Sequence, residues 1–326
     1  MRQTWFYRSN TVMLGTESGD RGNNAPSTSD ERCCRLGVIR YKSGGRFMSG
    51  QNISGRSRLA GLMLLLTGLA GPALAADYTV SVEPSYPPDQ ARDVYRPLLE
   101  YLSKATGQRF VLHYPSNYHL LWRDIRNNTP VDFAFEEAQF TDYRAQRFGF
   151  EPLVRTIEPS TYALIAQPEV ADQGSNALIG RLVVSMPSPS MGYALLVELF
   201  RNPISQPEVL STAASWRDGV EMIFAGEADA AMVPMYIAQL YPNLVEMHNS
   251  RSLPGRAFSA AGTVPDEVKA AVRDALLKLN EDESLYTVIN EIGTTQFVPT
   301  SADEFKGNQN MLRGFFGYTE PTAAAQ

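Results

Sequence analysis

The stretch that decides the fold runs from Asp77 to Tyr114 and reads DYTVSVEPSYPPDQARDVYRPLLEYLSKATGQRFVLHY. Its first residues, Tyr78–Glu83, favour a β-strand. Apolar residues then recur at helical spacing from Asp89, whose side chain is placed to cap a helix, to Gly107, which ends it. A second strand is predicted over Arg109–Tyr114. Strand, helix and strand in this order are the repeating unit of a sheet covered by helices, so the predicted fold class is α/β.

The same alternation continues along the chain in two sets. We predict further helices over 118–128, 137–148, 193–200, 216–224, 265–279 and 284–292, and further strands over 131–135, 155–166, 182–185 and 228–233. Each set has a short apolar strand with one aspartate, Asp132 or Asp229, for which we expect a structural role at the neighbouring turn. We therefore predict one lobe over 76–167, a second lobe over 168–257, and a return segment, 258–326, whose C-terminal helices pack on the first lobe.

Residues 48–75 have the order of a secretory signal peptide. Two arginines precede an apolar run of about a dozen residues, which is shorter than the roughly 20 that a membrane span needs. Small residues follow, and we predict cleavage between Ala75 and Ala76 and export to the periplasm. Residues 1–47 are polar and lack apolar periodicity, so we interpret them as an overextended start or a disordered extension.

Charge and cysteine content separate the leader from the rest of the chain. Residues 1–75 hold ten of the 29 basic and four of the 35 acidic residues, which leaves 76–326 with a formal charge of −12. This acidity argues against a nucleic-acid partner. Both cysteines, Cys33 and Cys34, lie in the leader, so the exported chain has no thiol for catalysis, metal binding or disulfides.

Motifs of the common enzyme classes are missing from the sequence. It has three histidines, His113, His119 and His248, and no Gly-rich phosphate loop, Gly-x-Ser-x-Gly elbow or His-Glu-x-x-His. We therefore predict that the protein is not an enzyme and uses neither a metal nor another cofactor. Paired carboxylates such as Glu136 and Glu227 keep an enzyme on the same scaffold as an alternative.

Four motifs, in this order, are similar to those of one protein family. They read YRPLLEYLSKATG (95–107), NNTPVDFAF (127–135), FAGEADAA (224–231) and LNEDESLY (279–286). In their order and spacing they resemble the periplasmic solute-binding proteins of the phosphate/phosphite/phosphonate ABC-transporter group, the PhnD-like proteins. The resemblance covers the chain from about Asp77 to about Met311.

The resemblance implies a two-lobed periplasmic-binding fold of type II, with the ligand in a cleft between the lobes and closure about a hinge. In open α/β sheets the ligand lies beyond the carboxyl ends of the strands. The residues that this rule places at the cleft, and that we expect to bind ligand, are Ser85, Tyr86, Tyr118, Glu136, Ser188, Ser190, Met191, Gly192 and Tyr236.

Two positions distinguish this chain from the family pattern. The second-lobe loop of the family usually reads Ser-Thr-Ser-Gly and surrounds a tetrahedral anion with hydroxyls and backbone N–H groups. Here the matching residues are Pro189, Ser190, Met191 and Gly192, which supply one hydroxyl. Glu136 and Glu137 stand where the family tends to have neutral small residues or proline, and a carboxylate at the cleft would repel an anion. The alternative role of Glu137 is to begin the next helix. The expected solute is therefore a phosphonate- or phosphate-like oxyanion or a related compound that carries an amine, with a tyrosine stacked on the amine.

Function and partners follow from the same resemblance. We expect a substrate-binding component that delivers a small-molecule solute to an ABC permease and acts as a monomer. A binding protein that reports its ligand to a membrane sensor kinase is the alternative, because both outputs rely on the closed state of the two lobes.

Overall fold

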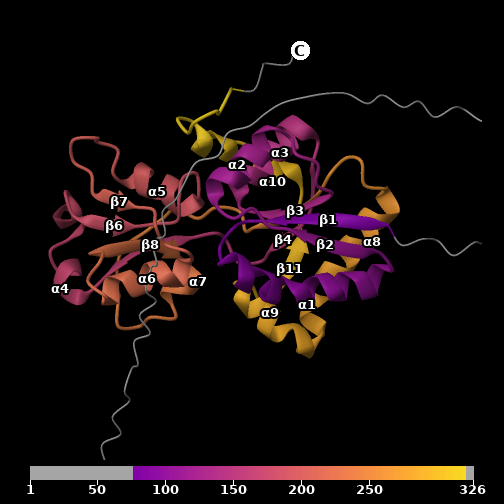
Figure 1. Cartoon of the computed structure of the whole chain (residues 1–326), viewed down its shortest axis with the longest axis horizontal. Coiled ribbons are helices and arrows are strands. Elements are labelled where there is room, and N and C mark those ends of the chain that lie inside the picture. Colours follow the sequence, from indigo (N-terminus) through magenta and orange to yellow (C-terminus); the bar gives the residue numbers. More distant parts are fainter. Residues whose placement is uncertain (1–75, 321–326) are drawn as a thin grey trace, which may run out of the picture. The chain divides into compact units, whose positions relative to one another are not determined.

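Two β-sheets flanked by helices organise the part of the protein that the computed structural model describes, residues 76–320 (Figure 1). The predicted signal peptide and the predicted extension over 1–47 lie outside these residues. The helices are α1 (Pro88–Thr106), α2 (Tyr118–Arg126), α3 (Ala138–Phe148), α4 (Pro168–Ala171), α5 (Met191–Leu199), α6 (Trp216–Phe224), α7 (Met235–Ala238), α8 (Asp266–Leu277), α9 (Tyr286–Glu291) and α10 (Ala302–Phe305). None of the described helices has the length and apolar character needed to cross a membrane.

The first sheet has six strands in the order β11-β4-β10-β3-β1-β2. They are β1 (Asp77–Val82), β2 (Arg109–His113), β3 (Phe133–Glu136), β4 (Glu151–Thr156), β10 (Ala257–Ala260) and β11 (Phe297–Pro299). Strands β1, β2 and β3 are parallel, as the strand–helix–strand pattern predicts, whereas β10 runs antiparallel to β3 and β4. Helices α1, α8 and α9 cover one face, and α2, α3 and α10 cover the other (Figure 1).

The second sheet has five strands in the order β7-β6-β8-β5-β9. They are β5 (Tyr162–Ala166), β6 (Leu182–Val184), β7 (Glu208–Leu210), β8 (Ala230–Pro234) and β9 (Val245–Asn249). The sequence analysis placed Tyr162–Ala166 at the end of the first lobe, and this boundary is wrong. All five residues of β5 are buried in the second sheet, where they pair with β8 and β9. The chain therefore crosses to the second lobe before residue 162, and it returns ahead of β10.

The aspartate that recurs in both lobes, Asp132 or Asp229, makes similar hydrogen bonds in the two sheets. Asp132 accepts hydrogen bonds at Oδ2 from the Thr79 backbone N–H (2.7 Å) and hydroxyl (2.8 Å). Asp229 accepts at Oδ2 from the backbone N–H of Leu182 (3.1 Å). In both lobes an aspartate just ahead of one strand thus caps the first N–H groups of the parallel neighbour, so these two residues are structural.

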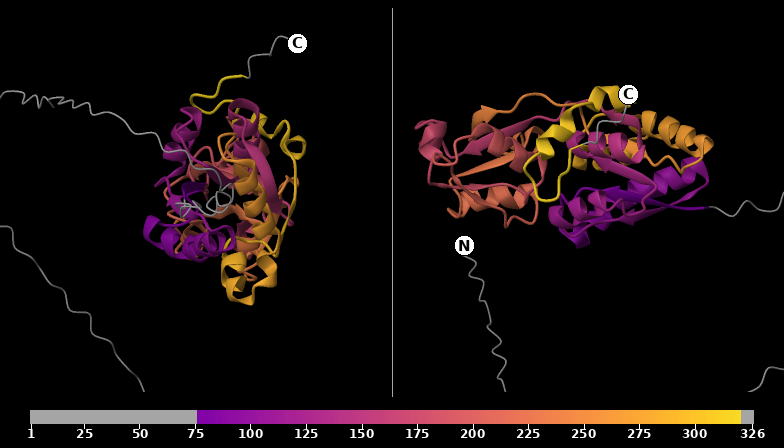
Figure 2. Two further views of the ribbon diagram at one scale, coloured as in Figure 1. Left: turned by 90° about the vertical axis from the view of Figure 1, so that its right-hand side faces the viewer. Right: turned by 90° about the horizontal axis from the view of Figure 1, so that it is seen from above.

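The hydrophobic core consists of two clusters. One fills the first sheet and its α1, α8 and α9 face. The other fills the second sheet and continues into α2 and α3 of the first lobe, where Trp122 and Phe140 are buried. The C-terminal segment lies across this junction (Figure 2). The Phe315 ring packs against the Tyr193 ring of α5, with centroids 5.9 Å apart, and the Trp122 indole N–H donates to the Phe316 carbonyl.

Candidate functional site

Residues of both lobes line two adjacent pockets. The larger, which we call the groove, has a volume of about 570 Å³ and lies between α1 and α9 of one lobe and α6 and α7 of the other (Figure 1). Its lining is Ser85, Tyr86, Gln90, Asp93, Val94, Pro97, Ser215, Trp216, Arg217, Tyr236, Ile237, Ser284, Thr287, Val288 and Glu291. The ion pair between Arg217 and Glu291 (3.5 Å) joins the two lobes here.

The smaller, which we call the crossing pocket, has a volume of about 230 Å³ and lies where the chain passes between the lobes. Its lining is Glu137, Thr156, Glu158, Pro159, Ser160, Thr161, Tyr162, Pro234, Met235, Tyr236, Gln239, Arg256 and Gly293. The two crossings hydrogen-bond each other, because Ser160 and Leu253 exchange backbone bonds of 3.0 and 3.1 Å. Tyr236 is common to both pockets.

Arg256 is the cation of the crossing pocket. Its guanidinium lies 4.9 Å from the ring centroid of Phe135 and 5.6 Å from that of Tyr236, within the range of cation–π contacts. Within residues 76–320, no ion pair and no side-chain hydrogen bond engages this guanidinium. Its N–H donors are therefore available to a solute.

Glu137 is a buried acid in the same pocket. Its Oε2 accepts a hydrogen bond from the Ser160 hydroxyl (2.6 Å), and its Oε1 accepts one from the Tyr162 hydroxyl (3.2 Å). Burial raises the pKa of Glu137, while the positive charge of Arg256 and the two hydroxyl donors act in the opposite direction. The pocket thus presents a cation and a hydrogen-bonded carboxyl group side by side.

Glu83, the residue after β1, forms hydrogen bonds that hold Glu137 and Tyr118 in place. Its Oε1 accepts from the backbone N–H of Glu137 (2.5 Å), and its Oε2 accepts from the Tyr118 hydroxyl (2.9 Å). Burial, with a contribution from the neighbouring Glu137, raises the pKa of Glu83 to about 8. Burial beside Glu137 thus favours the protonated form of Glu83.

Glu136 lies outside both pockets, contrary to the expectation that it faces the cleft. Its carboxylate forms a buried ion pair with Arg144 of α3, at 2.9 Å from Nε. The reason is the alternation of side chains along β3, which turns neighbours to opposite faces of the sheet. Glu136 points to α3, and Glu137, the next residue, points to the crossing pocket.

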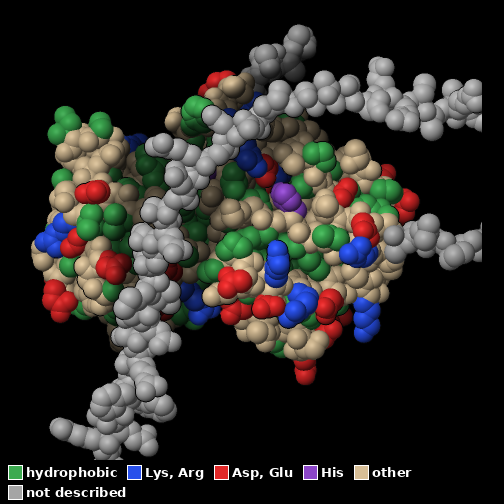
Figure 3. Space-filling view, in the orientation of Figure 1, with side chains coloured by type: hydrophobic (Ala, Val, Ile, Leu, Met, Phe, Trp, Pro, Cys, Tyr) green, Lys and Arg blue, Asp and Glu red, His purple; other side chains and the backbone are tan. Residues whose placement is uncertain are grey.

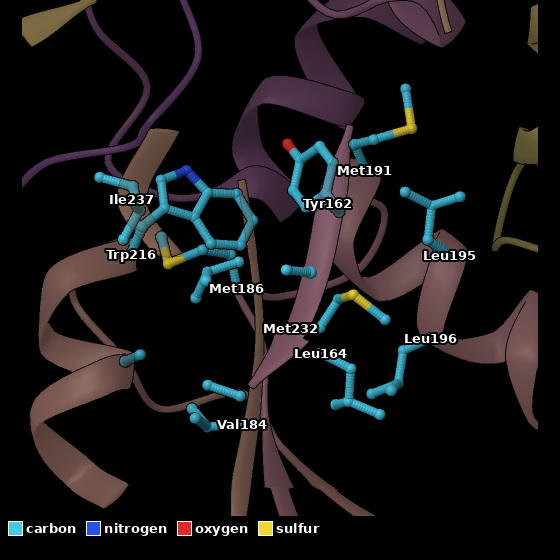
Figure 4. Close-up of a cluster of buried hydrophobic side chains, with 14 of the residues drawn as sticks. Tyr162, Leu164, Val184, Met186, Met191, Leu195, Leu196, Trp216, Met232 and Ile237 are labelled. Carbon is cyan, nitrogen blue, oxygen red and sulfur yellow. The ribbon is translucent and has the colours of Figure 1, made fainter. Parts of the chain in front are cut away.

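The second-lobe loop over 187–192 lies behind Trp216 and lines neither pocket. Ser190 is fully buried and caps α5 by accepting from the Tyr193 N–H (3.2 Å). At Gly192, an added Cβ would lie 3.0 Å from two ring carbons of Trp216. Figure 4 shows Trp216 on the α6 side and Met191 on the α5 side of Tyr162. Side chains therefore fill the place beside this helix terminus.

The surface outside the pockets has no large region of one charge on the face shown in Figure 3, where acidic and basic side chains are interspersed over both lobes. Among the described residues there is also no cluster of three or more side chains that could hold a metal ion.

A sequence model of one family, described as the periplasmic substrate-binding protein of a phosphonate ABC transporter, matches residues 80–305. The chain belongs to this family. Its members are substrate-binding proteins that work with an ABC permease and are not enzymes, as the sequence analysis predicted. A search of curated proteins returned no significant match.

Solved structures of other binding proteins share the fold. A binding-protein component of an ABC phosphonate transporter from Pseudomonas aeruginosa has a TM-score of 0.59 and 15% identity, over 71% of this chain and 83% of that one. PhnD1 from Prochlorococcus marinus, in complex with methylphosphonate, has a TM-score of 0.61 and 12% identity, over 73% and 97%. At these identities the likeness concerns the fold alone, and it confirms the predicted two-lobed α/β architecture.

The predicted site residues of this periplasmic binding protein fall into two groups. Ser85, Tyr86 and Tyr236 line the groove, and Tyr236 also lines the crossing pocket. Outside both pockets lie Tyr118, which hydrogen-bonds Glu83, and Glu136, Ser188, Ser190, Met191 and Gly192.

Sequence reasoning did not assign the two central groups of the crossing pocket, Arg256 and Tyr162. Each lies at a crossing between the lobes. Tyr162 is the first residue of β5, where the chain enters the second sheet, and Arg256 directly precedes β10, where the chain returns to the first sheet. A signal was present in Pro254-Gly255, because a turn ahead of a buried strand marks the return to the first lobe. The sequence indicated Glu137 as a candidate acid at the cleft, with the start of the following helix, α3, as its alternative role.

Proposed function

We propose that the binding protein captures a small acidic solute in the crossing pocket, closes its two lobes on it and delivers it to the permease. The observation that carries the proposal is Arg256, a guanidinium that faces a pocket with its donors unengaged by residues 76–320. A partly buried cation without an ion-pair partner loses hydration, so a solute that brings an acid group to Arg256 would stabilise the closed state.

The pocket wall favours closure on a bound solute. Ser160, Tyr162 and Arg256 belong to or adjoin the two crossings, and Tyr236 comes from the second lobe. A solute held by these residues touches the hinge and both lobes at once. Its binding energy is then largest when the lobes approach each other, which is the condition for a ligand to shift the population.

The site of the acid group differs from the one that the family pattern implies. Trp216 and Met191 fill the place beside the second-lobe helix terminus, so Arg256 replaces the loop as the main donor. A charge-assisted hydrogen bond of this type contributes about 1.5–3 kcal/mol. We propose that this bond, and not the loop, determines affinity.

The test compares Arg256→Gln with Arg273→Gln, which removes an exposed arginine of α8. Solute that copurifies with the full exported chain is identified by mass spectrometry, and its affinity is measured by calorimetry after unfolding, dialysis and refolding. We expect Arg256→Gln to weaken binding by about tenfold or more and Arg273→Gln to leave it unchanged. Equal affinity in both variants would refute the proposal.

A further inference from the structure

We infer that the crossing pocket binds a small zwitterion of the amino-acid type, with its carboxylate on Arg256 and its ammonium group on Glu137. The inference rests on the proposed function and adds the chemical class of the solute. It starts from the presence of two opposite charges in one pocket of about 230 Å³, which is large enough for a solute of amino-acid size.

The acid side of the site favours a planar group. The rings of Phe135 and Tyr236 lie within 4.9 and 5.6 Å of the Arg256 guanidinium and restrict its orientation. A guanidinium presents parallel N–H donors along its edge, and such an edge matches the two oxygens of a carboxylate. A tetrahedral phosphonate would gain from several convergent N–H donors, which the occupied terminus of α5 does not offer.

The amine side of the site is the carboxyl group of Glu137. Its two oxygens accept one hydrogen bond each, from Ser160 and Tyr162. A carboxylate has about four acceptor positions, so lone pairs remain for an ammonium donor from the pocket. An ammonium group also suits the neighbouring tyrosine ring of Tyr236.

The charges of the pocket lining also favour a zwitterion over a phosphonate. The described lining contains Arg256 and two acids, Glu137 and Glu158. Hydrogen bonds from Thr294 and Thr295 lower the pKa of Glu158, against the effect of its burial, and keep it ionised. A phosphonate dianion would meet one cation and two carboxylates, whereas a zwitterion brings no net charge and pairs with one of each.

The experiment uses the full exported chain, freed of solute as above, and three kinds of probe. The twenty standard amino acids and β-alanine are zwitterions, propionate is an acid without an amine, and phosphate and methylphosphonate are tetrahedral anions. Thermal shift selects binders and calorimetry measures them, in the wild type, in Glu137→Gln and Arg256→Gln, and in the control Glu304→Gln, which changes a half-exposed pair outside both pockets.

We expect at least one zwitterion to bind and its affinity to fall by about tenfold or more in both pocket variants, but not in the control. The affinity of propionate should fall in Arg256→Gln alone. Alanine-sized zwitterions and propionate can be compared on the wild type alone. This comparison therefore tests the contribution of the amine even where a variant fails to fold.

Two results would overturn the inference. One is that no amino acid binds; the other is that an amino acid binds Glu137→Gln as tightly as the wild type. Binding of phosphate or methylphosphonate alone, with sensitivity to Arg256→Gln, overturns the zwitterion and leaves the proposed function standing. If no probe binds and no solute copurifies, the proposed function fails as well.

Discussion

Three buried glutamates in a short space show how strongly the surroundings of a residue decide its role. Glu136 has an arginine partner, Glu137 has two hydroxyl donors and a nearby cation, and Glu83 has one hydroxyl and one backbone donor. The sequence places Glu136 and Glu137 next to each other without distinguishing them. Only the direction in which each side chain leaves β3 assigns one to structure and the other to the pocket.

The first prediction concerns Glu83 and pH. The unfolded chain releases the proton of Glu83 near the ordinary value of 4.5, whereas the folded chain holds it to about pH 8. Folding therefore binds a proton between these values, and the contribution of Glu83 to stability, complete below about pH 4.5, is lost as the pH rises to about 8. Burial shifts the pKa of Glu137 in the same direction.

Unfolding by urea at about pH 5 and about pH 8 measures this effect. We expect the free energy of unfolding of the wild type to fall over this range and that of Glu83→Gln to fall less, because an amide has no proton to release. The same pH dependence in both proteins would show that Glu83 does not retain its proton on folding.

The second prediction concerns the buried pair of Glu136 and Arg144. Glu136→Gln leaves a buried guanidinium without its counter-charge and should lower the free energy of unfolding by about 3–5 kcal/mol. The half-exposed pair of Arg155 and Glu304 is the control, and Glu304→Gln should cost about 0–1 kcal/mol. Neither change should alter solute affinity; a loss of affinity in Glu136→Gln without a loss of stability would return Glu136 to the site.

Among the elements, α5 is the one whose surroundings depart furthest from the family pattern. It begins at Met191, and the Trp216 ring of α6 lies against Gly192 in its first turn. Ser185, buried at the end of β6, has no hydrogen-bond partner for its hydroxyl among the described residues and lies against the same glycine. Helices α5 and α6 are thus packed at their N-terminal ends with no space for a β-carbon at Gly192.

Two glycine substitutions test this packing. In Gly192→Ala the new methyl group lies 2.9 Å from the Ser185 hydroxyl oxygen and 3.0 Å from the Trp216 ring, so we expect a loss of about 1–3 kcal/mol in the free energy of unfolding. Gly219→Ala, within α6, finds its nearest atoms at 3.6 Å and should gain about 0.5–1 kcal/mol from helix propensity. Urea unfolding of both variants decides, and a stable Gly192→Ala would contradict the described contact.

The elements also show what the sequence could and could not establish. Helix α6 begins and ends where it was predicted, and the strands that follow Asp132 and Asp229 were recognised, because both depend on local patterns. The lobe to which β5 belongs could not be recognised, since an apolar strand reads the same in either sheet. The pocket was missed in part for a related reason: Arg256 and Glu137 are 119 positions apart and meet only through the crossings.

At the scale of the whole molecule, the lobes are joined by more than the crossings. The second hydrophobic cluster extends into α2 and α3, and Phe315 reaches α5 from the C-terminal segment. On the opposite side, across the groove, the direct ionic contact among the described pairs is that of Arg217 with Glu291. Separation of the lobes at the groove therefore breaks this ion pair.

The last prediction concerns this ionic contact. Glu291→Gln keeps the hydrogen bond from the Tyr86 hydroxyl to the Glu291 carbonyl (2.6 Å) but removes the charge that pairs with Arg217. Because the pair is partly exposed, we expect a stability change of about 0–1 kcal/mol and up to about fivefold weaker solute binding, which high salt reproduces in the wild type. Calorimetry at low and high salt measures both. Salt-independent binding by the wild type would exclude a role of the pair in closure.

The hydrogen bonds between the two crossings have a practical consequence. Gly255 touches the backbone of Thr156 and Glu158, and Ser160 and Leu253 exchange hydrogen bonds, so we expect the proposed closure of the lobes to bend both crossings together about one axis. A single distance between the two lobes would report such a motion. Since residues 76–326 contain no cysteine, two introduced cysteines, one on each lobe, would take a fluorophore pair at defined positions. The protein is thereby suited to an optical sensor for whichever solute it binds.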